Sequence, residues 1–232
     1  MISVIIPVYN EEEHIKATVR TLYLHDRSKL IHEIIIVDGG STDRTIDSLK
    51  AEGVKALKSP VKGRAAQMNL GASAASGEVL YFLHADTLPP DEFSQDIKQA
   101  IGQGFDAGCY RLSFDHKHWF LRANVWFTRF NVDTIRFGDQ SLFIRKNIFM
   151  ATGGFCEKHI VMEDQEFVKR IRKNNRFTII PKPVLTSARK YLENGIYKTQ
   201  FIFFIIFLMY KAGFPQYKLL AAYRNFINQN KL

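Results

Sequence analysis

The sequence predicts an α/β fold, a mostly parallel sheet flanked by helices, because strand-like and helix-like segments alternate from its first residues. Four runs rich in β-branched or aromatic residues, 2–10, 32–40, 54–59 and 78–86, are each followed by a helical pattern or a helix-start signal. With 232 residues, 46% of them hydrophobic, the chain is long enough to bury the core of one such domain. Parallel strands joined by helices form right-handed crossovers, so the runs predict one continuous sheet.

Each predicted helix has its own signal. Residues 11–26 carry acids in the first turn and place one apolar face at helical spacing, formed by Ile15, Val19, Leu22 and Tyr23. The following helices are predicted at 41–53, ending at Gly53, at 63–77, where small side chains dominate, and at 89–101, which starts with two prolines.

The alternation loosens after residue 105. Strands are predicted at 106–114 and 136–146, with an aromatic helix at 119–130 between them, then a helix at 162–175 and a short strand at 176–181. We expect an α/β domain at 1–185 and a helical tail at 186–232.

The net charge of +9 and the isoelectric point near 9.5 predict an anionic partner, either nucleic acid, a phosphorylated substrate or acidic lipid. No basic helix with interleaved aromatics or known nucleic-acid module is present, so no nucleic acid partner is expected. Cys109 and Cys156 form no metal or disulfide pattern, which suits buried thiols in a reducing cytoplasm. The apolar amino terminus is short and is followed by three glutamates, which predicts a strand rather than a signal peptide.

Polar side chains follow all four predicted strands of the first half. In an open parallel sheet, ligands bind outside the carboxyl ends of the strands, near the switch in strand order. Each acid taken singly could be a turn or cap residue, but the coincidence across four strands favours a ligand site. The residues at this edge are Tyr9, Asn10, Glu11, Asp38, Gly63, Arg64, His84 and Asp86.

No G-x-G-x-x-G follows the first strand and no G-x-x-x-x-G-K-[ST] occurs, so neither a Rossmann dinucleotide site nor a P-loop is predicted. The acids, the arginine and the aromatic suit a base, a ribose and a diphosphate held with a divalent ion.

Four blocks along the chain together resemble the family 2 glycosyltransferases, which are inverting enzymes of the GT-A fold. The blocks are VIIPVYNEE, IIIVDGGSTDRT, GRAAQMNLGASAASGEVLYFLHADT and MEDQEF, and their order and spacing match. Three segments look closest to a small bacterial subgroup of these transferases, namely GRAAQMN, FGDQSLFIRK and TSARKYLENGIYKTQ.

The resemblance implies a nucleotide-sugar site for a UDP- or GDP-type donor. It implies that the base and ribose are held by Pro7, Tyr9, Glu11 and Asp38. It also implies that Arg64 lies near the diphosphate, which a guanidinium can bind through two oxygens.

Asp86 matches the last aspartate of the family's D-x-D motif, which implies Mn²⁺ or Mg²⁺ as the cofactor that bridges the diphosphate. His84 stands at the first position of this motif, which is normally acidic. Residues i and i+2 of a strand share a face, so both side chains are expected to point the same way. We expect His84 to bond the ribose or a phosphate rather than the metal.

The block MEDQEF implies the catalytic base. By resemblance, Asp164 is the general base that takes the proton of the acceptor hydroxyl, and Glu163 supports it. Without the other blocks, these acids would be interpreted as a helix start that complements the dipole. Asp139 and Gln165 are expected to line the acceptor pocket.

Residues 187–191 differ from the Q-x-x-R-W block of processive family members. Ser187, Lys190 and Tyr191 replace its Gln, Arg and Trp, so a non-processive enzyme is expected, with Arg189 or Lys190 near phosphate.

The tail contains the apolar block FIFFIIFLMY, which is about half the length that a spanning helix needs. A core helix, an interfacial helix and a contact in a homo-dimer each fit the block. Flanking lysines and aromatics favour an interfacial helix on an anionic membrane surface.

The sequence thus predicts a metal-dependent, inverting glycosyltransferase that is peripheral on the cytoplasmic face of the cell membrane. It would move a sugar from a nucleoside diphosphate to the hydroxyl of a lipid-linked or membrane-associated acceptor. The alternatives are a nucleotidyltransferase on a related fold, whose Gly-rich basic loop after the first strand is missing, and a non-catalytic nucleotide-sugar binder.

Overall fold

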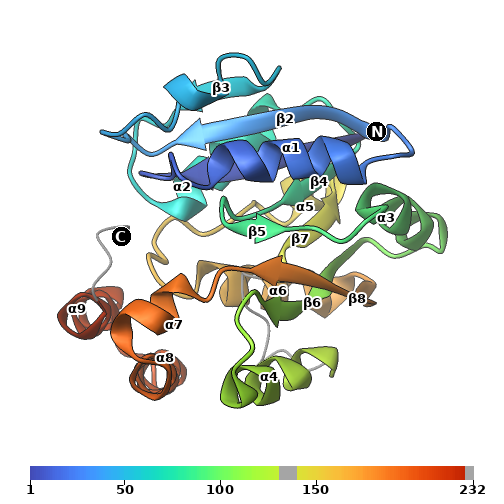
Figure 1. Ribbon diagram of the computed structural model, residues 1–232. Coiled ribbons are helices and arrows are strands. Elements are labelled where there is room, and N and C mark those ends of the chain that lie inside the picture. Colours follow the sequence, from blue (N-terminus) through green and yellow to red (C-terminus); the bar gives the residue numbers. More distant parts are fainter. Residues whose placement is uncertain (131–139, 228–232) are drawn as a thin grey trace.

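A computed structural model describes residues 1–130 and 140–227, which form one eight-stranded mixed sheet with helices on both faces (Figure 1). The strand order is β3-β2-β1-β4-β7-β6-β8-β5. The strands are β1 Ile2–Val8, β2 Ile31–Asp38, β3 Lys55–Lys58, β4 Val79–Phe82, β5 Thr87–Leu88, β6 Ala107–Phe114, β7 Leu142–Arg145 and β8 Phe177–Thr186.

The helices cover the two faces of the sheet and extend below it (Figure 1). Their bounds are α1 Ile15–His25, α2 Arg64–Ala74, α3 Phe93–Gly102, α4 Trp119–Trp126, α5 Lys146–Ala151, α6 Glu163–Asn174, α7 Arg189–Asn194, α8 Ile196–Lys211 and α9 Gln216–Phe226. Two short 3₁₀ turns are η1 Asp47–Leu49 and η2 Phe127–Arg129. The predicted α/β fold class is confirmed.

The alternation of side chains along β1 builds a core on each side of the sheet. Val4 and Ile6 are buried with apolar residues of α1 and α3, whereas Ile5 is buried with those of α2, α5 and α6. Successive residues of a strand point to opposite faces, so a continuously apolar strand is required where both faces are covered. Gly71 lets α2 lie close to the sheet, because a Cβ there would lie 2.5 Å from Cγ2 of Ile5.

The strand order reverses at β1, which positions the site. β1 pairs in parallel with β2 on one side and with β4 on the other. Beyond β4, the strand β7 runs antiparallel to both β4 and β6, while β6 and β8 are parallel. In Figure 1 the strands β2 and β8 end on the left, where α7, α8 and α9 lie. The carboxyl ends of β1 and β4 therefore form the topological switch point at which ligands of such sheets bind.

Several sequence expectations about elements were wrong. β4 ends at Phe82, so His84 and Asp86 lie in the following loop and no strand periodicity fixes their direction. Tyr23 is exposed, although the pattern placed it on the buried face of α1. The last strand is longer than predicted and continues to Thr186, because a register shift after Tyr110 accommodates the extra residues.

The helix predicted at 41–53 is absent from these described residues, which hold turns and the short η1. The carboxylate of Asp43 accepts hydrogen bonds from its near neighbour Thr45 and from the backbone N–H of Glu12. Such local side-chain bonds offer the backbone an alternative to helical hydrogen bonds. They tie this segment to the loop after β1.

The tail is helical, as predicted. One face of α8 is buried against α9, through Ile202 and Ile206 on α8 and Leu219 on α9. Within the two described ranges, no helix has both the length and the apolar character needed to cross a membrane.

Candidate functional site

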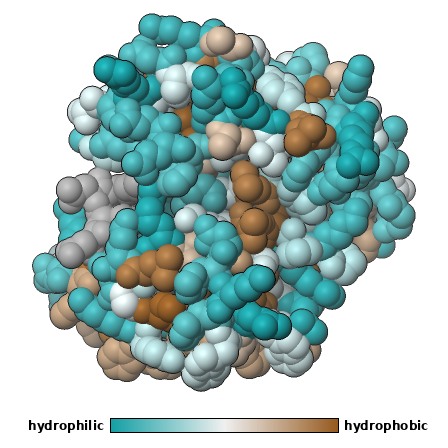
Figure 2. All heavy atoms as spheres, viewed as in Figure 1, coloured by the Kyte–Doolittle hydropathy of each residue, from teal (hydrophilic) through white to brown (hydrophobic). Residues whose placement is uncertain are grey.

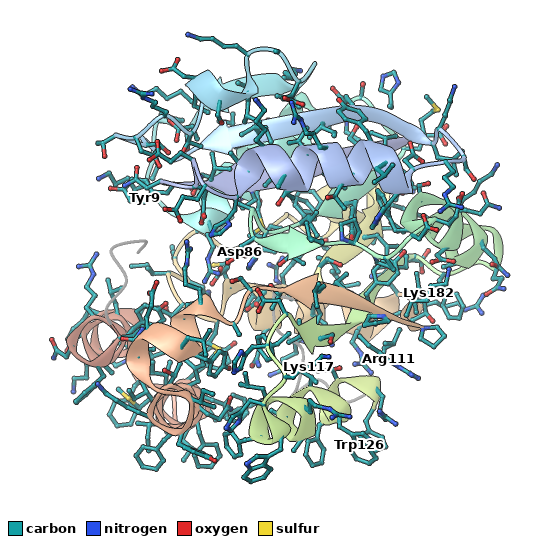
Figure 3. All side chains as sticks on the ribbon, viewed as in Figure 1. Tyr9, Asp86, Arg111, Lys117, Trp126 and Lys182 are labelled. Carbon is teal, nitrogen blue, oxygen red and sulfur yellow. The ribbon has the colours of Figure 1, made fainter. Side chains whose placement is uncertain are left out.

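A cavity opens at the switch point, between the carboxyl ends of β1 and β4 and the start of the tail. Five side chains predicted from the sequence line it, which are Pro7, Glu11, Arg64, His84 and Asp86. Figure 3 places Asp86 at this left-hand edge of the sheet, facing the tail helices, with Tyr9 above it. The sheet topology thus brings together residues that are as far apart in sequence as Pro7 and Asp86.

The tail forms the opposite wall of the cavity. The lining includes Ser187, Lys190, Tyr191, Phe203 and Tyr223. The Nζ of Lys190 lies 5.5 Å from the ring centroid of Phe203 and 5.8 Å from that of Tyr223, so two aromatic faces hold this cation at the site. The division of the chain at residue 185 stays a prediction, but both parts contribute to one cavity.

A second, smaller pocket adjoins the first, and His84 lines both. Glu163 and Asp164, the first two residues of α6, lie in this second pocket with Ser141 of the segment before β7. The predicted catalytic acids therefore sit next to the cavity that holds the predicted diphosphate and metal residues. His84 separates the two groups.

Arg64 and Glu163 form the central ion pair of the site. The Nε of Arg64 lies 2.9 Å from Oε1 of Glu163, and the carboxylate side chain is only 3% exposed. Burial raises the pKa of the Glu163 carboxyl above its ordinary value, because a charge is costly in a low dielectric, and the Arg64 guanidinium opposes this rise. The neighbouring Asp164 carboxylate adds to the rise. Glu163 is therefore a charge partner for Arg64 and is poorly placed to be an exposed base.

The turn before α6 aims these acids. Met162 has φ +66°, a left-handed conformation that is rare for a residue with a side chain. Such strained residues occur at functional sites, where the surrounding packing fixes them. The backbone N–H of Gln165 donates to Oδ1 of Asp164 at 2.7 Å, which orients this carboxylate, while Gln165 itself is buried on α6.

Two predicted nucleotide residues, Asp38 and Tyr9, have structural partners of their own. Oδ1 of Asp38 accepts hydrogen bonds from the backbone N–H and the hydroxyl of Ser41, at 2.9 Å and 2.6 Å. The Nζ of Lys62 lies 5.7 Å from the ring centroid of Tyr9. Tyr9 lies just after β1, and Asp38 is the last residue of β2. Their role in binding the nucleotide stays a prediction. Asp139 lies outside the described residues.

The sequence analysis did not predict Gln67, whose side chain bridges β1 and β2 by hydrogen bonds. Its buried Nε2 donates to the carbonyl oxygen of Val8 at 2.9 Å and to that of Val37 at 2.7 Å. Gln67 lies three residues after Arg64 on α2, so this contact anchors the turn of helix that carries Arg64. Its position within the GRAAQMN block was the available signal.

Arg189 ties the tail to the loop after β1. Its Nη1 lies 2.8 Å from Nε2 of His14, and its Nη2 lies 3.8 Å from a carboxylate oxygen of Glu11. Of the two residues expected near phosphate, Lys190 lines the cavity, whereas Arg189 holds the wall in place. These contacts join the start of the tail to residues near the amino terminus.

The donors at the cavity fit a divalent ion that is shared with a bound diphosphate. In the described ranges, no three His, Cys, Asp or Glu side chains are grouped so as to hold a metal by themselves. Mg²⁺ and similar ions in nucleotide sites commonly take one or two carboxylates, with substrate phosphates and water completing the shell. Asp86, with His84 beside it in the same cavity, supplies such a partial set.

Comparison with known proteins shows similarity to sugar transferases. Glycosyl transferase family 2 matches residues 3–158. The undecaprenyl-phosphate 4-deoxy-4-formamido-L-arabinose transferase of Pectobacterium atrosepticum is 30% identical over 211 residues, covering 83% of this chain and 58% of that protein. Glycosyltransferase AglE of Haloferax volcanii is 26% identical over 183 residues, covering 73% and 60%. The chain spans less than two thirds of the length of these curated relatives.

Solved structures with similar folds include one complex with a nucleotide sugar and one with a nucleoside diphosphate. The mannosyltransferase PcManGT from Pyrobaculum calidifontis, in complex with GDP-Man and Mn²⁺, superposes with a TM-score of 0.70 at 17% identity, covering 91% of this chain and 63% of that one. TarS 1–349 of S. aureus, in complex with UDP, gives 0.68 at 19% identity, covering 80% and 60%. At these identities the likeness shows the fold alone. With the family match over residues 3–158, it follows that the chain belongs to glycosyl transferase family 2 and has the predicted GT-A fold.

Proposed function

We propose that this protein transfers a sugar, with inversion, from a UDP- or GDP-type donor to an acceptor hydroxyl on a lipid-linked molecule at the cytoplasmic membrane face. The observation that carries the proposal is that His84 lines both the cavity and the adjoining pocket. It connects a cavity lined by Arg64, Lys190 and Asp86 to a pocket that holds Asp164. Cations for a diphosphate and a carboxylate for an acceptor thus lie on adjacent sides of one site.

The donor half of the site balances charge. Arg64 and Lys190 are cations that suit the diphosphate, while Glu11 and Asp86 are carboxylates that would repel it without a counterion. Asp86 would hold Mn²⁺ or Mg²⁺, and this ion, when bound, neutralises charge that develops on the leaving diphosphate.

The base is assigned to Asp164 rather than Glu163. Asp164 is half-buried at the amino end of α6, where the helix dipole stabilises a carboxylate, and it lines the pocket next to His84. Glu163 is buried and is engaged by Arg64. A single displacement needs one base opposite the leaving group, and we assign this role to Asp164.

The names of several relatives contain undecaprenyl phosphate, which supports an acceptor on a lipid. A hydroxyl acceptor must lose a proton during transfer, whereas a phosphate oxygen is already ionised at neutral pH. The dependence of the rate on Asp164 therefore reports which acceptor group the enzyme uses. Strong dependence supports the hydroxyl that we propose.

Binding of nucleoside diphosphates to the full chain tests the donor half. We expect calorimetry to show that UDP or GDP binds in Mn²⁺ and much more weakly in EDTA, and that Asp86→Ala loses the metal-dependent part. Asp47→Ala, an exposed acid on η1 that pairs with Lys50, is the matched control and should bind as the wild type does. Equal affinities with Mn²⁺ and with EDTA would reject the metal role of Asp86. No affinity for any nucleoside diphosphate would reject the donor site.

A further inference from the structure

An apolar stripe faces outward along α8. Tyr197, Phe201, Phe204, Ile205 and Leu208 are all exposed and recur at the three- and four-residue spacing of one helix face. Phe201 alone is 65% exposed. The opposite face of α8 is buried against α9. The helix therefore presents a continuous apolar surface to its surroundings instead of burying all of it in the core.

A second element, distant in sequence, adds aromatic side chains next to this stripe. The helix α4 and the turn η2 carry both tryptophans of the chain, Trp119 and Trp126, which are 67% and 46% exposed. Phe127 and Phe130 beside them are also exposed. In Figure 1, α4 and α8 lie together below the sheet, and Figure 3 shows Trp126 pointing away from it.

The two elements are in direct contact. The ring centroid of Tyr197 on α8 lies 4.9 Å from that of Phe120 and 6.4 Å from that of Trp119 on α4. In Figure 2, tan apolar residues lie along the lower edge, and brown residues lie at the lower left, near the centre and at the upper right. We call the exposed aromatic and apolar side chains of residues 119–130 and 197–208 the aromatic face.

The chain segments that carry the aromatic face, with the helices α7 and α9 beside them, are strongly basic. Segments 116–130 and 186–227 contain nine lysines and arginines and one acid, Glu193. Nine positive charges less one negative charge give these segments a net charge of +8, against +9 for the whole chain. The basic residues are Lys117, Arg122, Arg129, Arg189, Lys190, Lys198, Lys211, Lys218 and Arg224. The guanidinium of Arg129 lies over the ring of Trp126, 4.6 Å from its centroid, so a cation and an amphipathic ring are in contact at this face.

We propose that α4, η2 and α8 together form a single docking face for an anionic bilayer, with both tryptophans at the level of the lipid headgroups. Tryptophan and tyrosine have apolar rings with a polar handle and concentrate at membrane interfaces. Lysines and arginines around them are attracted to acidic headgroups. The inference rests on the membrane location in the proposed function and does not depend on the transfer chemistry.

Charge decides between a bilayer and a second copy of the chain. A symmetric dimer through the aromatic face would bring two basic rims against each other, and like charges across an interface are costly. An anionic lipid surface is complementary to the same rim. The observations therefore favour lipid as the occupant.

Docking through two elements also fixes the orientation of the site. Phe203 lines the catalytic cavity, while Phe204, the next residue of α8, faces outward in the aromatic face. The same helix thus contacts the cavity on one side and lipid on the other. A lipid-linked acceptor can reach the cavity along α8 without leaving the membrane surface.

The intrinsic tryptophans of the full chain test the inference, because both lie in α4. With vesicles containing phosphatidylglycerol, we expect a blue-shifted emission and strong quenching by lipids brominated near the headgroup end of the acyl chain. The variants Trp119→Phe and Trp126→Phe, each with one tryptophan left, should both show the quenching. Vesicles of phosphatidylcholine alone should bind more weakly, and added salt should weaken binding to the acidic vesicles.

Charge and apolar variants have matched controls elsewhere on the surface. Arg122→Glu in α4 should weaken vesicle binding at least about fivefold, whereas Lys98→Glu on α3 should not. Phe127→Ser should weaken binding, whereas Leu24→Ser, which changes an exposed apolar residue of α1, should leave it unchanged.

Each contrary outcome has a distinct meaning. Vesicle flotation without any change in tryptophan emission overturns the two-element face and leaves membrane docking to the tail alone. Failure to float on acidic vesicles rejects both this inference and the membrane location. A concentration-dependent dimer whose tryptophans become shielded without lipid rejects the bilayer in favour of a second copy. Transfer activity, assayed in detergent, reports on the catalytic proposal independently of all three.

Discussion

Replacement of Arg64 by methionine tests the central ion pair of the site. Methionine keeps an unbranched apolar side chain of similar length but removes the cation that lies 2.9 Å from the Glu163 carboxylate. The carboxylate then remains buried, at 3% exposure, without that guanidinium. A buried carboxyl that loses its cation takes up a proton rather than remain charged, so the pKa of Glu163 should rise further in the variant.

Protonation sets an upper limit on the loss of stability. Holding a carboxyl of ordinary pKa 4.5 protonated at pH 7 costs about 3.4 kcal/mol, and at pH 5.5 about 1.4 kcal/mol, because one pKa unit corresponds to about 1.36 kcal/mol. The wild type already bears part of this cost, since burial raises the pKa of Glu163 there as well. Arg64 is 35% exposed, so water screens the pair. We therefore expect Arg64→Met to lose about 2–3 kcal/mol at pH 7 and less than about 1 kcal/mol at pH 5.5.

The sign of the pH dependence follows from the raised pKa. A group whose pKa is higher in the folded state supports stability at low pH and loses that support as the pH rises through its folded pKa. Denaturant unfolding of the variant should therefore approach the wild-type free energy as the pH falls from 8 to 5.5. The measurement is the difference in unfolding free energy between variant and wild type at each pH.

Two further variants separate the ion pair from other effects. Arg64→Met combined with Glu163→Gln removes both charges and should recover most of the lost stability, because no buried carboxylate remains. Arg20→Met removes a guanidinium that is 64% exposed in its pair with Glu52 and should cause a small loss that does not change with pH in this range. An equal loss for Arg64→Met at pH 8 and pH 5.5, with no recovery in the double variant, would refute the reasoning.

Further predictions concern the base, the helix that carries Arg64, and a charge remote from the site. Asp164→Asn should reduce turnover on a hydroxyl acceptor about a hundredfold to ten-thousandfold while donor affinity by calorimetry stays close to wild type, and retention of more than a tenth of the rate would exclude Asp164 as the base. Gly71→Ala should lower the free energy of unfolding by about 1–3 kcal/mol and weaken diphosphate binding, because the new Cβ would lie 2.5 Å from Ile5 and push α2 outward. An unchanged melting temperature would contradict this close approach. Burial raises the pKa of Glu33, but hydrogen bonds from Ser76 and Ser3 outweigh it and lower the pKa to about 2. The resulting stabilisation is complete above the ordinary value of 4.5 and is lost as the pH falls toward 2. The unfolding free energy of Glu33→Gln should therefore depend less steeply on pH over that range than that of the wild type. Identical pH profiles for the two proteins would refute the role of this carboxylate.

The sequence by itself determined the class of fold and five of the side chains that line the cavity at the switch point. Continuous apolar strands such as β1 need cover on both faces, and strand-to-helix alternation leaves few topologies, so the carboxyl edge of the sheet could be located in advance. Pro7, Glu11, Arg64, His84 and Asp86 were placed there on this ground and by resemblance, and all five line one cavity.

The tertiary structure alone decided which of these groups interact and how the tail packs. The ion pair of Arg64 with Glu163 joins α2 to α6, and Arg189 joins the tail to the loop after β1, so neither follows from local sequence patterns. The segment 41–53 was predicted as a helix because propensity is local, whereas bonds from distant residues such as Glu12 set its conformation. The uniform apolarity of α8 could not reveal which side packs on α9 and which side, together with both tryptophans of α4, remains exposed, because that choice depends on the surfaces that the rest of the chain presents.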